Sequence, residues 1–411
     1  MQKLSVDTSK DSITPDTLLV LQFRTVNDPW LPRLKSFECA EATEAFTPFI
    51  PLFLSPKTTR IDIRFAKGTP ILAIGSMIKK FSPLCPDLES ITLNDLPRDS
   101  AVTEAVSEML LACNRDTLNS FCVDSPLTEE AREVVYRLPG LSTLWVVIQG
   151  PISLPAVALP NLTVIDVEYN DNLNWLRAFR GAKLGKLKTA AFHSKSEQVG
   201  DFLGALESAA LAASARNALT TFLFYTSRSW NPNYSSLLWF NQLKEVMIQF
   251  SCEGGCSSRI DDDDIISLAR AMPKLEILRL GTTPCATSTG VTVNGLIALA
   301  RLCPRLSTLR LHFQAATFVE AATSAATLLD PSDSGLVQRE DCALTNLEVG
   351  KTPIPAQSGL TVALVLLQIF PRILNIGYTN PEWRSVEGTI KNFRQVRAFV
   401  HHTGKAHPSY A

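Results

Sequence analysis

Residues 272–283 read MPKLEILRLGTT, and about 31 residues later a similar stretch, CPRLSTLRLHF, occupies residues 303–313. Both contain the frame L-x-x-L-x-L, formed by Leu275, Leu278 and Leu280 and by Leu306, Leu309 and Leu311. Side chains alternate between the two faces of a β-strand, so the last two leucines of a frame share one face and the residue between them takes the other. Each frame therefore predicts a short strand with one buried face.

The same frame recurs along most of the chain, at about 14 places with spacings from about 21 to 38 residues. RIDIRF at residues 60–65 is one copy, and the weakest is formed by Val396 and Phe399. The other copies begin at Leu34, Leu88, Leu118, Leu141, Leu162, Leu187, Leu219, Leu243, Leu344 and Ile373. A mean spacing near 28 residues is typical of long leucine-rich repeats.

Helical spacing of apolar residues appears between the frames, at residues 105–113, 263–272 and 295–303. Proline follows several helical segments and stops the helix, at Pro86, Pro139, Pro273 and Pro304. The sequence therefore predicts an α/β leucine-rich-repeat solenoid, a horseshoe with a parallel concave sheet, outer helices and about 14 irregular repeats. We expect residues 31–411 to form this domain and residues 1–30 to be an N-terminal tail.

Composition indicates a folded, soluble chain. Of its 411 residues, 45% are hydrophobic and 19% are charged, with a formal net charge of −1. This balance favours neither nucleic acid nor an anionic membrane surface as a partner. No secretory leader is visible, and the longest apolar run, residues 360–370, is too short to span a membrane. We expect a monomer in the cytoplasm or nucleus, with its nine cysteines reduced.

The sequence contains no recognisable catalytic or metal-binding motif, so we expect no enzyme activity, no catalytic residue, no cofactor and no metal. The four aspartates at residues 261–264 are compatible with a cation site, but helix capping is favoured. Cys252 and Cys256 lack a second pair at zinc spacing, which favours a loop. Cysteines at predicted helix ends should be small buried hydrophobes, namely Cys85, Cys113 and Cys303.

Three segments interrupt the repeat pattern. Residues 315–341 lengthen one repeat, and their DPSDSG turn chemistry predicts a mobile stretch at residues 330–335 that tolerates deletion. Residues 227–233 and 252–258 are rich in Gly, Pro, Asn and Ser, which is typical of loops.

Residues 262–281 (DDDIISLARAMPKLEILRLG) and 290–314 (GVTVNGLIALARLCPRLSTLRLHFQ) resemble the repeat region of fungal F-box and leucine-rich-repeat proteins. Residues 49–63 (FIPLFLSPKTTRIDI) resemble the first repeats of that family. The resemblance implies the substrate-receptor part of a cullin-RING ubiquitin ligase, in which an N-terminal F-box docks the adaptor and the repeats hold a protein substrate.

Residues 1–31 contain no L-P-x-E-[LIV]-L-like run of the kind that begins an F-box. We therefore expect adaptor binding only if an F-box is missing from this chain, and the chain is either a truncated F-box protein or a free-standing repeat protein. The alternative function is a leucine-rich-repeat regulator or inhibitor of another protein, such as a small-GTPase activator, with no link to ubiquitin.

The residue in the middle of each L-x-L frame should face the concave side. This column contains Trp145, Asp166, Ala191, Leu223, Met247, Arg279, Arg310 and Glu348, flanked by His193, Tyr225, Gln249 and His312. Seven of them form the candidate protein-binding site: Trp145, Leu223, Tyr225, Met247, Arg279, Arg310 and His312.

Two interpretations of this column remain open. In one, Glu348 neutralises Arg310 while Leu223 and Met247 cover one another. In the other, an acidic or phosphorylated protein segment lies against Arg279 and Arg310, because guanidinium groups pair strongly with such anions. Two aromatic side chains, Trp145 and Tyr225, would then anchor its apolar part.

Overall fold

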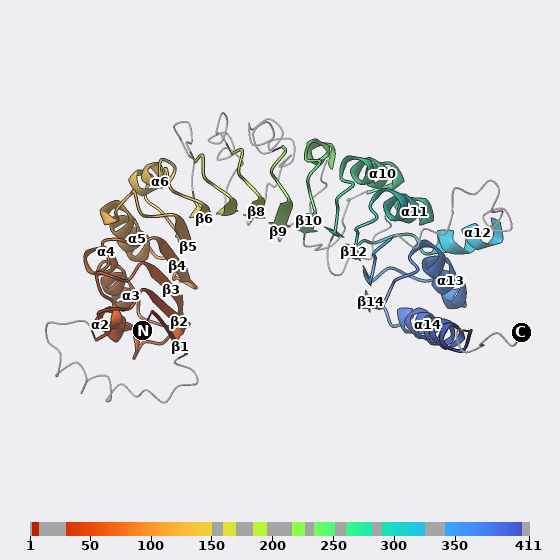
Figure 1. Cartoon of the computed structure of the whole chain (residues 1–411), viewed down its shortest axis with the longest axis horizontal. Coiled ribbons are helices and arrows are strands. Elements are labelled where there is room, and N and C mark those ends of the chain that lie inside the picture. The colour runs from red at the N-terminus through yellow and green to blue at the C-terminus, as the bar shows by residue number, and fades with distance from the viewer. Residues whose placement is uncertain are drawn as a thin grey trace, which may run out of the picture. The chain divides into compact units, whose positions relative to one another are not determined.

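The computed structural model describes residues 2–7, 30–149, 159–169, 184–194, 216–226, 234–250, 260–281, 290–324 and 342–404. The chain divides into two compact units (Figure 1). The first comprises Met1–Gln198 and Ala205–Ala218, and the second comprises Val199–Gly204 and Leu219–Ala411.

The first unit is a parallel sheet whose strands follow one another in chain order. Its described strands are β1 (Lys3–Val6), β2 (Ser36–Ala42), β3 (Arg60–Phe65), β4 (Ser90–Asn94), β5 (Ser120–Pro126), β6 (Thr143–Ile148), β7 (Val164–Tyr169) and β8 (Thr189–Ser194). Helices cover one face of this sheet: η1 (Thr47–Phe49), α2 (Ile50–Phe53), α3 (Ile71–Ile78), α4 (Phe81–Leu84), α5 (Ser100–Ala112) and α6 (Glu129–Val135) (Figure 1).

The second unit follows the same plan. Its described strands are β9 (Thr221–Thr226), β10 (Glu245–Phe250), β11 (Ile277–Leu280), β12 (Thr308–Arg310), β13 (Asn346–Gly350) and β14 (Asn375–Tyr378), parallel and in chain order. Its helices are η2 (Tyr234–Trp239), α10 (Asp262–Ala271), α11 (Val293–Leu302), α12 (Ala316–Ser324), α13 (Gly359–Ile369) and α14 (Trp383–Gly404). The predicted α/β architecture with an all-parallel sheet is confirmed in each unit.

The core consists of the frame leucines and their equivalents. Leu278 on β11 is 1% exposed and Leu309 on β12 is 0% exposed, and the two are direct partners in the strand register. Both were predicted to be buried in successive strands, and this is confirmed. The predicted burial of Cys85, Cys113 and Cys303 at helix ends is also confirmed, since each is the residue that ends a helix.

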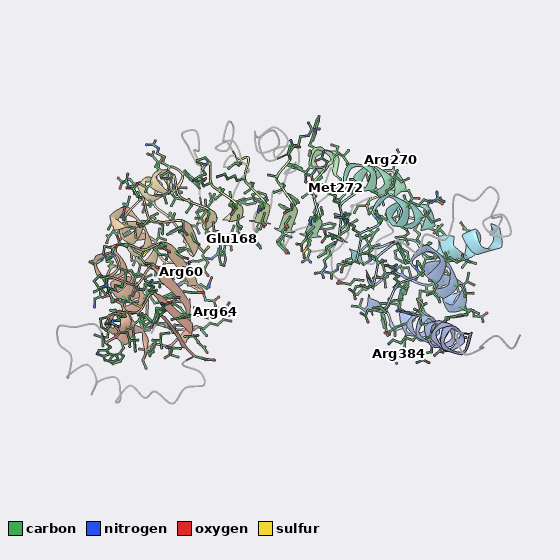
Figure 2. All side chains as sticks on the ribbon, in the orientation of Figure 1. Arg60, Arg64, Glu168, Arg270, Met272 and Arg384 are labelled. Atoms are coloured by element: carbon green, nitrogen blue, oxygen red, sulfur yellow. The ribbon has the colours of Figure 1, made fainter. Side chains whose placement is uncertain are left out.

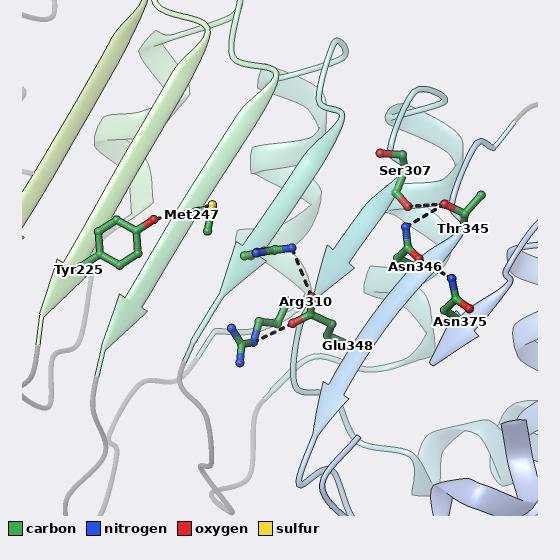
Figure 3. A network of polar contacts seen from close by, with 9 residues as sticks. Tyr225, Met247, Ser307, Arg310, Thr345, Asn346, Glu348 and Asn375 are labelled. Carbon is green, nitrogen blue, oxygen red and sulfur yellow. Dashed lines mark hydrogen bonds and ion pairs between the residues drawn. The ribbon is translucent and has the colours of Figure 1, made fainter. Parts of the chain in front are cut away.

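A repeated backbone contact joins successive strands at the point where they begin. The carbonyl oxygen of Thr163 accepts hydrogen bonds from the amides of Lys188 (2.8 Å) and Thr189 (3.0 Å). In the second unit the hydroxyl of Thr345 donates to the carbonyl of Ser307 at 3.2 Å (Figure 3). This accounts for the serine and threonine residues that precede many strands, because their hydroxyls add a third hydrogen bond to a carbonyl that already accepts two amides.

Two predictions about segments need correction, and a third segment gains detail. Residues 1–30 are not all tail, because β1 pairs with β2 in parallel, with Lys3 opposite Ser36. The weak frame at Val396 and Phe399 lies inside helix α14 and forms no strand. The insert at residues 315–341 begins with helix α12. Its remainder, including residues 330–335, and the loops at 227–233 and 252–258 lie outside the described residues.

No helix within the described ranges is long and apolar enough to cross a membrane.

Candidate binding faces of the two units

The sheet face opposite the helices is called the open face here, and it carries the residues that alternate with the buried ones. In the second unit, Leu223, Met247, Arg279, Arg310 and Glu348 follow one another in direct register across β9 to β13. All five are half-buried. The frame thus positions the predicted column correctly within this unit, since period-two burial fixes which residue faces outward.

Glu348 lies between the two arginines of this row and pairs with both. Its Oε2 is 3.4 Å from Nε of Arg310, and its Oε1 is 3.4 Å from Nη2 of Arg279 (Figure 3). The pairing of Glu348 with Arg310 that one interpretation required is therefore present, and it extends to Arg279. Two guanidinium groups share one carboxylate, so the cluster keeps one excess positive charge.

Apolar side chains stand beside the charged cluster on the two preceding strands. Leu223 on β9 is the register partner of Met247 on β10, and the hydroxyl of Tyr225 lies 4.0 Å from the sulfur of Met247 (Figure 3). A contact of this length between a hydroxyl and a thioether is weak. The row therefore changes from apolar to cationic within about three strand spacings, or about 14 Å.

His312 differs from its prediction as a solvent-facing flank of the column. It is only 9% exposed and lies beside Gly281 and Gly350, which have φ angles of +97° and +58°. A side chain at Gly350 would place its Cβ 2.7 Å from Cε1 of His312. The imidazole thus packs where two glycines leave room for it, so it contributes little surface to the open face.

Trp145 belongs to the first unit. On β6 it is half-buried and sits in register between Cys122 on β5 and Asp166 on β7. Asp166 faces His193 on β8, with 3.2 Å between its Oδ1 and Nε2 of the imidazole. The open face around Trp145 is thus acidic, in contrast to that of the second unit.

The aspartate run at residues 261–264 caps helices. Oδ1 of Asp261 accepts from the amide of Asp264 at 3.0 Å, while Oδ2 of Asp264 accepts from the amide of Asp261 at 3.3 Å, which is a reciprocal capping box. Asp262 reaches the next repeat and accepts from the amides of Thr292 (2.8 Å) and Gly295 (3.1 Å) at the start of α11. Capping, favoured over a cation site, is confirmed. Cys252 and Cys256 lie outside the described residues.

Within the ranges the structure describes, no three His, Cys, Asp or Glu side chains are grouped as a metal site would require. Of the seven candidate residues, the structure gathers Leu223, Tyr225, Met247, Arg279 and Arg310 on one open face. Their role in binding stays a prediction. No protein-family model matches the chain, and no curated protein does either.

Proposed function

We propose that the protein is a non-enzymatic, protein-binding scaffold of the leucine-rich-repeat type. Its second unit would hold a protein segment on the open face formed by Leu223, Tyr225, Met247, Arg279 and Arg310. One observation carries the proposal: Nε of Arg279 is shielded from solvent and has no hydrogen-bond acceptor in the described part of the chain. A shielded donor without an acceptor is costly, so a small shift of this guanidinium, whose side chain is 32% exposed, toward an acceptor of a bound partner would be favourable.

Electrostatics favour an acidic or phosphorylated partner. Each guanidinium has five N–H donors, and the one carboxylate of Glu348 serves both arginines at 3.4 Å. Donors therefore remain for a second anion, whose bidentate pairing with arginine would be stronger than a single contact. Leu223, Met247 and Tyr225 would cover the apolar part of the same segment.

The assignment to leucine-rich-repeat proteins, and to ubiquitin-ligase receptors among them, rests on the repeat geometry and on the sequence resemblance. Strands in chain order and buried frame leucines support a leucine-rich-repeat horseshoe. The resemblance to fungal F-box proteins supports a substrate receptor of a cullin-RING ubiquitin ligase, whose adaptor would bind an F-box that this chain does not display.

A charge-matched capture experiment tests the binding face. The tagged chain, its Arg279→Gln/Arg310→Gln variant and an Arg270→Gln/Arg301→Gln control would be incubated with cell extract. Glutamine is preferable to glutamate because two new carboxylates would crowd Glu348. The control arginines are exposed on helices α10 and α11, which cover the other face of the sheet. Figure 2 shows Arg270 on this helical side.

We expect the open-face variant to recover at least tenfold less partner than the control, with unchanged circular dichroism. Equal recovery of the same partners by all three proteins would place the site elsewhere. Adaptor and cullin among the captured proteins would favour the ubiquitin-ligase receptor. A partner captured without them would favour a repeat regulator that has no ubiquitin link.

A further inference from the structure

The open face of the first unit carries a row of side chains with uncompensated negative charge. This acidic row consists of Glu38, Asp62, Thr92, Cys122, Trp145 and Asp166, in direct register from β2 to β7. Glu38 is paired with Lys3 at 2.7 Å. Asp62 is exposed and has neither an ion pair nor a hydrogen bond within the described residues. Among the described residues, the ion-pair partner of Asp166 is His193, which offsets its charge only when the imidazole is protonated.

Most charges on both sides of the acidic row are compensated by ion pairs within the unit. Arg64 and Glu168 extend from the sheet away from the helices (Figure 2). The compensating ion pairs are Arg60 with Glu89 (4.0 Å), Arg64 with Asp95 (3.4 Å) and Arg98 with Glu168. Asp124 accepts hydrogen bonds from the amides of Asp95 and Leu96 and keeps its charge. The excess negative charge therefore lies on Asp62, Asp166 and Asp124, and of these Asp62 and Asp166 belong to the acidic row.

Trp145 and an unused carboxylate oxygen make the Asp166 end of the row suited to a cation. In the described part of the chain, Oδ1 of Asp166 is shielded from solvent and receives no hydrogen bond, because His193 stands at ion-pair distance but outside hydrogen-bond geometry. Trp145 is its register neighbour, and the face of an indole ring attracts a guanidinium or ammonium group. The Asp166 side chain is 30% exposed although its Oδ1 is shielded, so a basic side chain there would contact the ring and Oδ2 of the carboxylate.

We propose that the open face of the first unit binds a cationic peptide segment, with one basic side chain at Asp62 and another between Trp145 and Asp166. This surface is distinct from the cationic row of the second unit and would take a ligand of opposite charge. A single metal ion does not fit, since the two carboxylates are four strand spacings apart, or about 19 Å. An anionic membrane or nucleic acid would be repelled.

The spacing defines the ligand further. An extended chain advances about 3.3 Å per residue, so about six residues separate the two basic side chains. Arginine fits better than lysine, because its planar group stacks on an aromatic ring and also pairs with a carboxylate.

A labelled peptide tests the proposal on the full chain. The probe has arginine at its first and seventh positions with glycine and serine between them, and binding is followed by fluorescence anisotropy at low salt. The test variant is Asp62→Asn/Asp166→Asn. Its control is Glu89→Gln/Glu108→Gln, which changes the net charge equally, with one carboxylate beside Arg60 and the other on helix α5.

We expect affinity at least fivefold lower for the Asp62→Asn/Asp166→Asn variant and within twofold of wild type for the control. Equal losses in both variants, or no saturable binding up to about 1 mM peptide, would overturn the proposal. A peptide with glutamate in place of both arginines should bind at least fivefold more weakly than the arginine probe.

Cys122 reports where the peptide lies. It is half-exposed in the middle of the acidic row, so bound peptide should slow its maleimide labelling at least threefold, measured by mass spectrometry of the Cys122 fragment. Unchanged labelling at saturating peptide would show binding elsewhere. The Arg279→Gln/Arg310→Gln variant should keep its peptide affinity, so this proposal and the function proposed for the second unit can fail separately.

Discussion

Arg394 on helix α14 donates a hydrogen bond from Nη1 to the carbonyl oxygen of Ile373, 2.7 Å away. In an earlier repeat the equivalent carbonyl accepts a hydrogen bond from a threonine hydroxyl of the following repeat. The hydroxyl of Thr117 donates to the carbonyl oxygen of Leu88 at 2.9 Å. The last described strand, β14, has no such successor. Arg394 therefore supplies the bond that the next repeat would otherwise make, and α14 acts as the cap of the second unit.

Arg394→Ala should loosen this cap. Removing a donor to a part-buried carbonyl should lower the free energy of unfolding by about 1–3 kcal/mol. Because repeats contact mainly their neighbours, hydrogen exchange should quicken in β14 and α14 before it does in β9. Lys391→Ala is the control, since it removes only an exposed pair with Glu387. Equal effects of the two variants would refute the capping role.

Sequence periodicity sufficed for the strands because burial of alternate residues is a local property. Leu278 and Leu309 are buried as their frames predicted, and Arg279, between the two leucines of its frame, is half-buried on the opposite face. The role of the aspartates at residues 261–264 was also predictable, because a carboxylate just before a helix commonly caps the helix N-terminus. Strand β1 was not predicted, since KLSV has no frame of its own and is fixed by pairing with β2.

Contacts between distant residues could not be predicted from one sequence. Glu348 pairs with Arg279 across an intervening strand, and Arg98 pairs with Glu168 from a loop 70 residues away. The recess around His312 depends on two glycines that only folding brings together. The charge around the column was also not predictable: Trp145 lies beside Asp166 in the first unit, whereas the residues from Leu223 onward lead to Arg279 and Arg310 in the second.

Leu278→Ala should destabilise the second unit by about 2–5 kcal/mol, from lost burial and from the cavity that remains. Hydrogen exchange should quicken most in β10 to β12, the strands adjoining the cavity. Ile277→Ala, at the half-buried neighbouring position, is the control and should cost less. If β2 and β3 loosened as much as β10 to β12, the repeat-like organisation would be wrong.

Asp262→Ala should destabilise the start of α11 more than Asp263→Ala does. Asp262 accepts from the amides of Thr292 and Gly295 in the following repeat, whereas Asp263 is exposed. Both stand in the first turn of α10, so the loss of helix-dipole stabilisation is similar in the two variants. The difference in unfolding free energy, measured by urea denaturation, should be about 1–2 kcal/mol. Equal stability of the variants would contradict the contact between repeats.

The thiols at helix ends should resist alkylation in the native state at pH 8. Burial raises the pKa of Cys85, Cys113 and Cys303 to about 12. Only about one thiol in ten thousand is then the reactive thiolate at pH 8, and access is restricted as well. Fragment mass spectrometry after iodoacetamide treatment should show labelling of half-exposed Cys122 first among the described cysteines. Labelling of the three buried thiols at the same rate would contradict their packing.

Asp62→Asn should leave the protein as stable as wild type at pH 7 or make it more stable. Partial burial is the larger cause that raises the pKa of Asp62, and the charge of Glu38 on the neighbouring strand β2 is the second. The charges of Arg64 and Lys3 oppose this rise. With the folded-state pKa above the unfolded value of about 3.9, the folded state binds the proton more tightly. The free energy of unfolding therefore falls as pH rises through the folded-state pKa.

Asparagine should remove that part of the pH dependence. Relief of a like-charge pair on adjacent strands is worth about 0.2–1 kcal/mol, and the low end applies because Asp62 is exposed and screened by water. Urea denaturation of both proteins between pH 4 and pH 7 measures the difference. A variant less stable at pH 7 by more than about 0.5 kcal/mol would show that Asp62 stabilises the fold. A stable variant that also loses the cationic peptide would show that this carboxylate serves binding at a cost to stability.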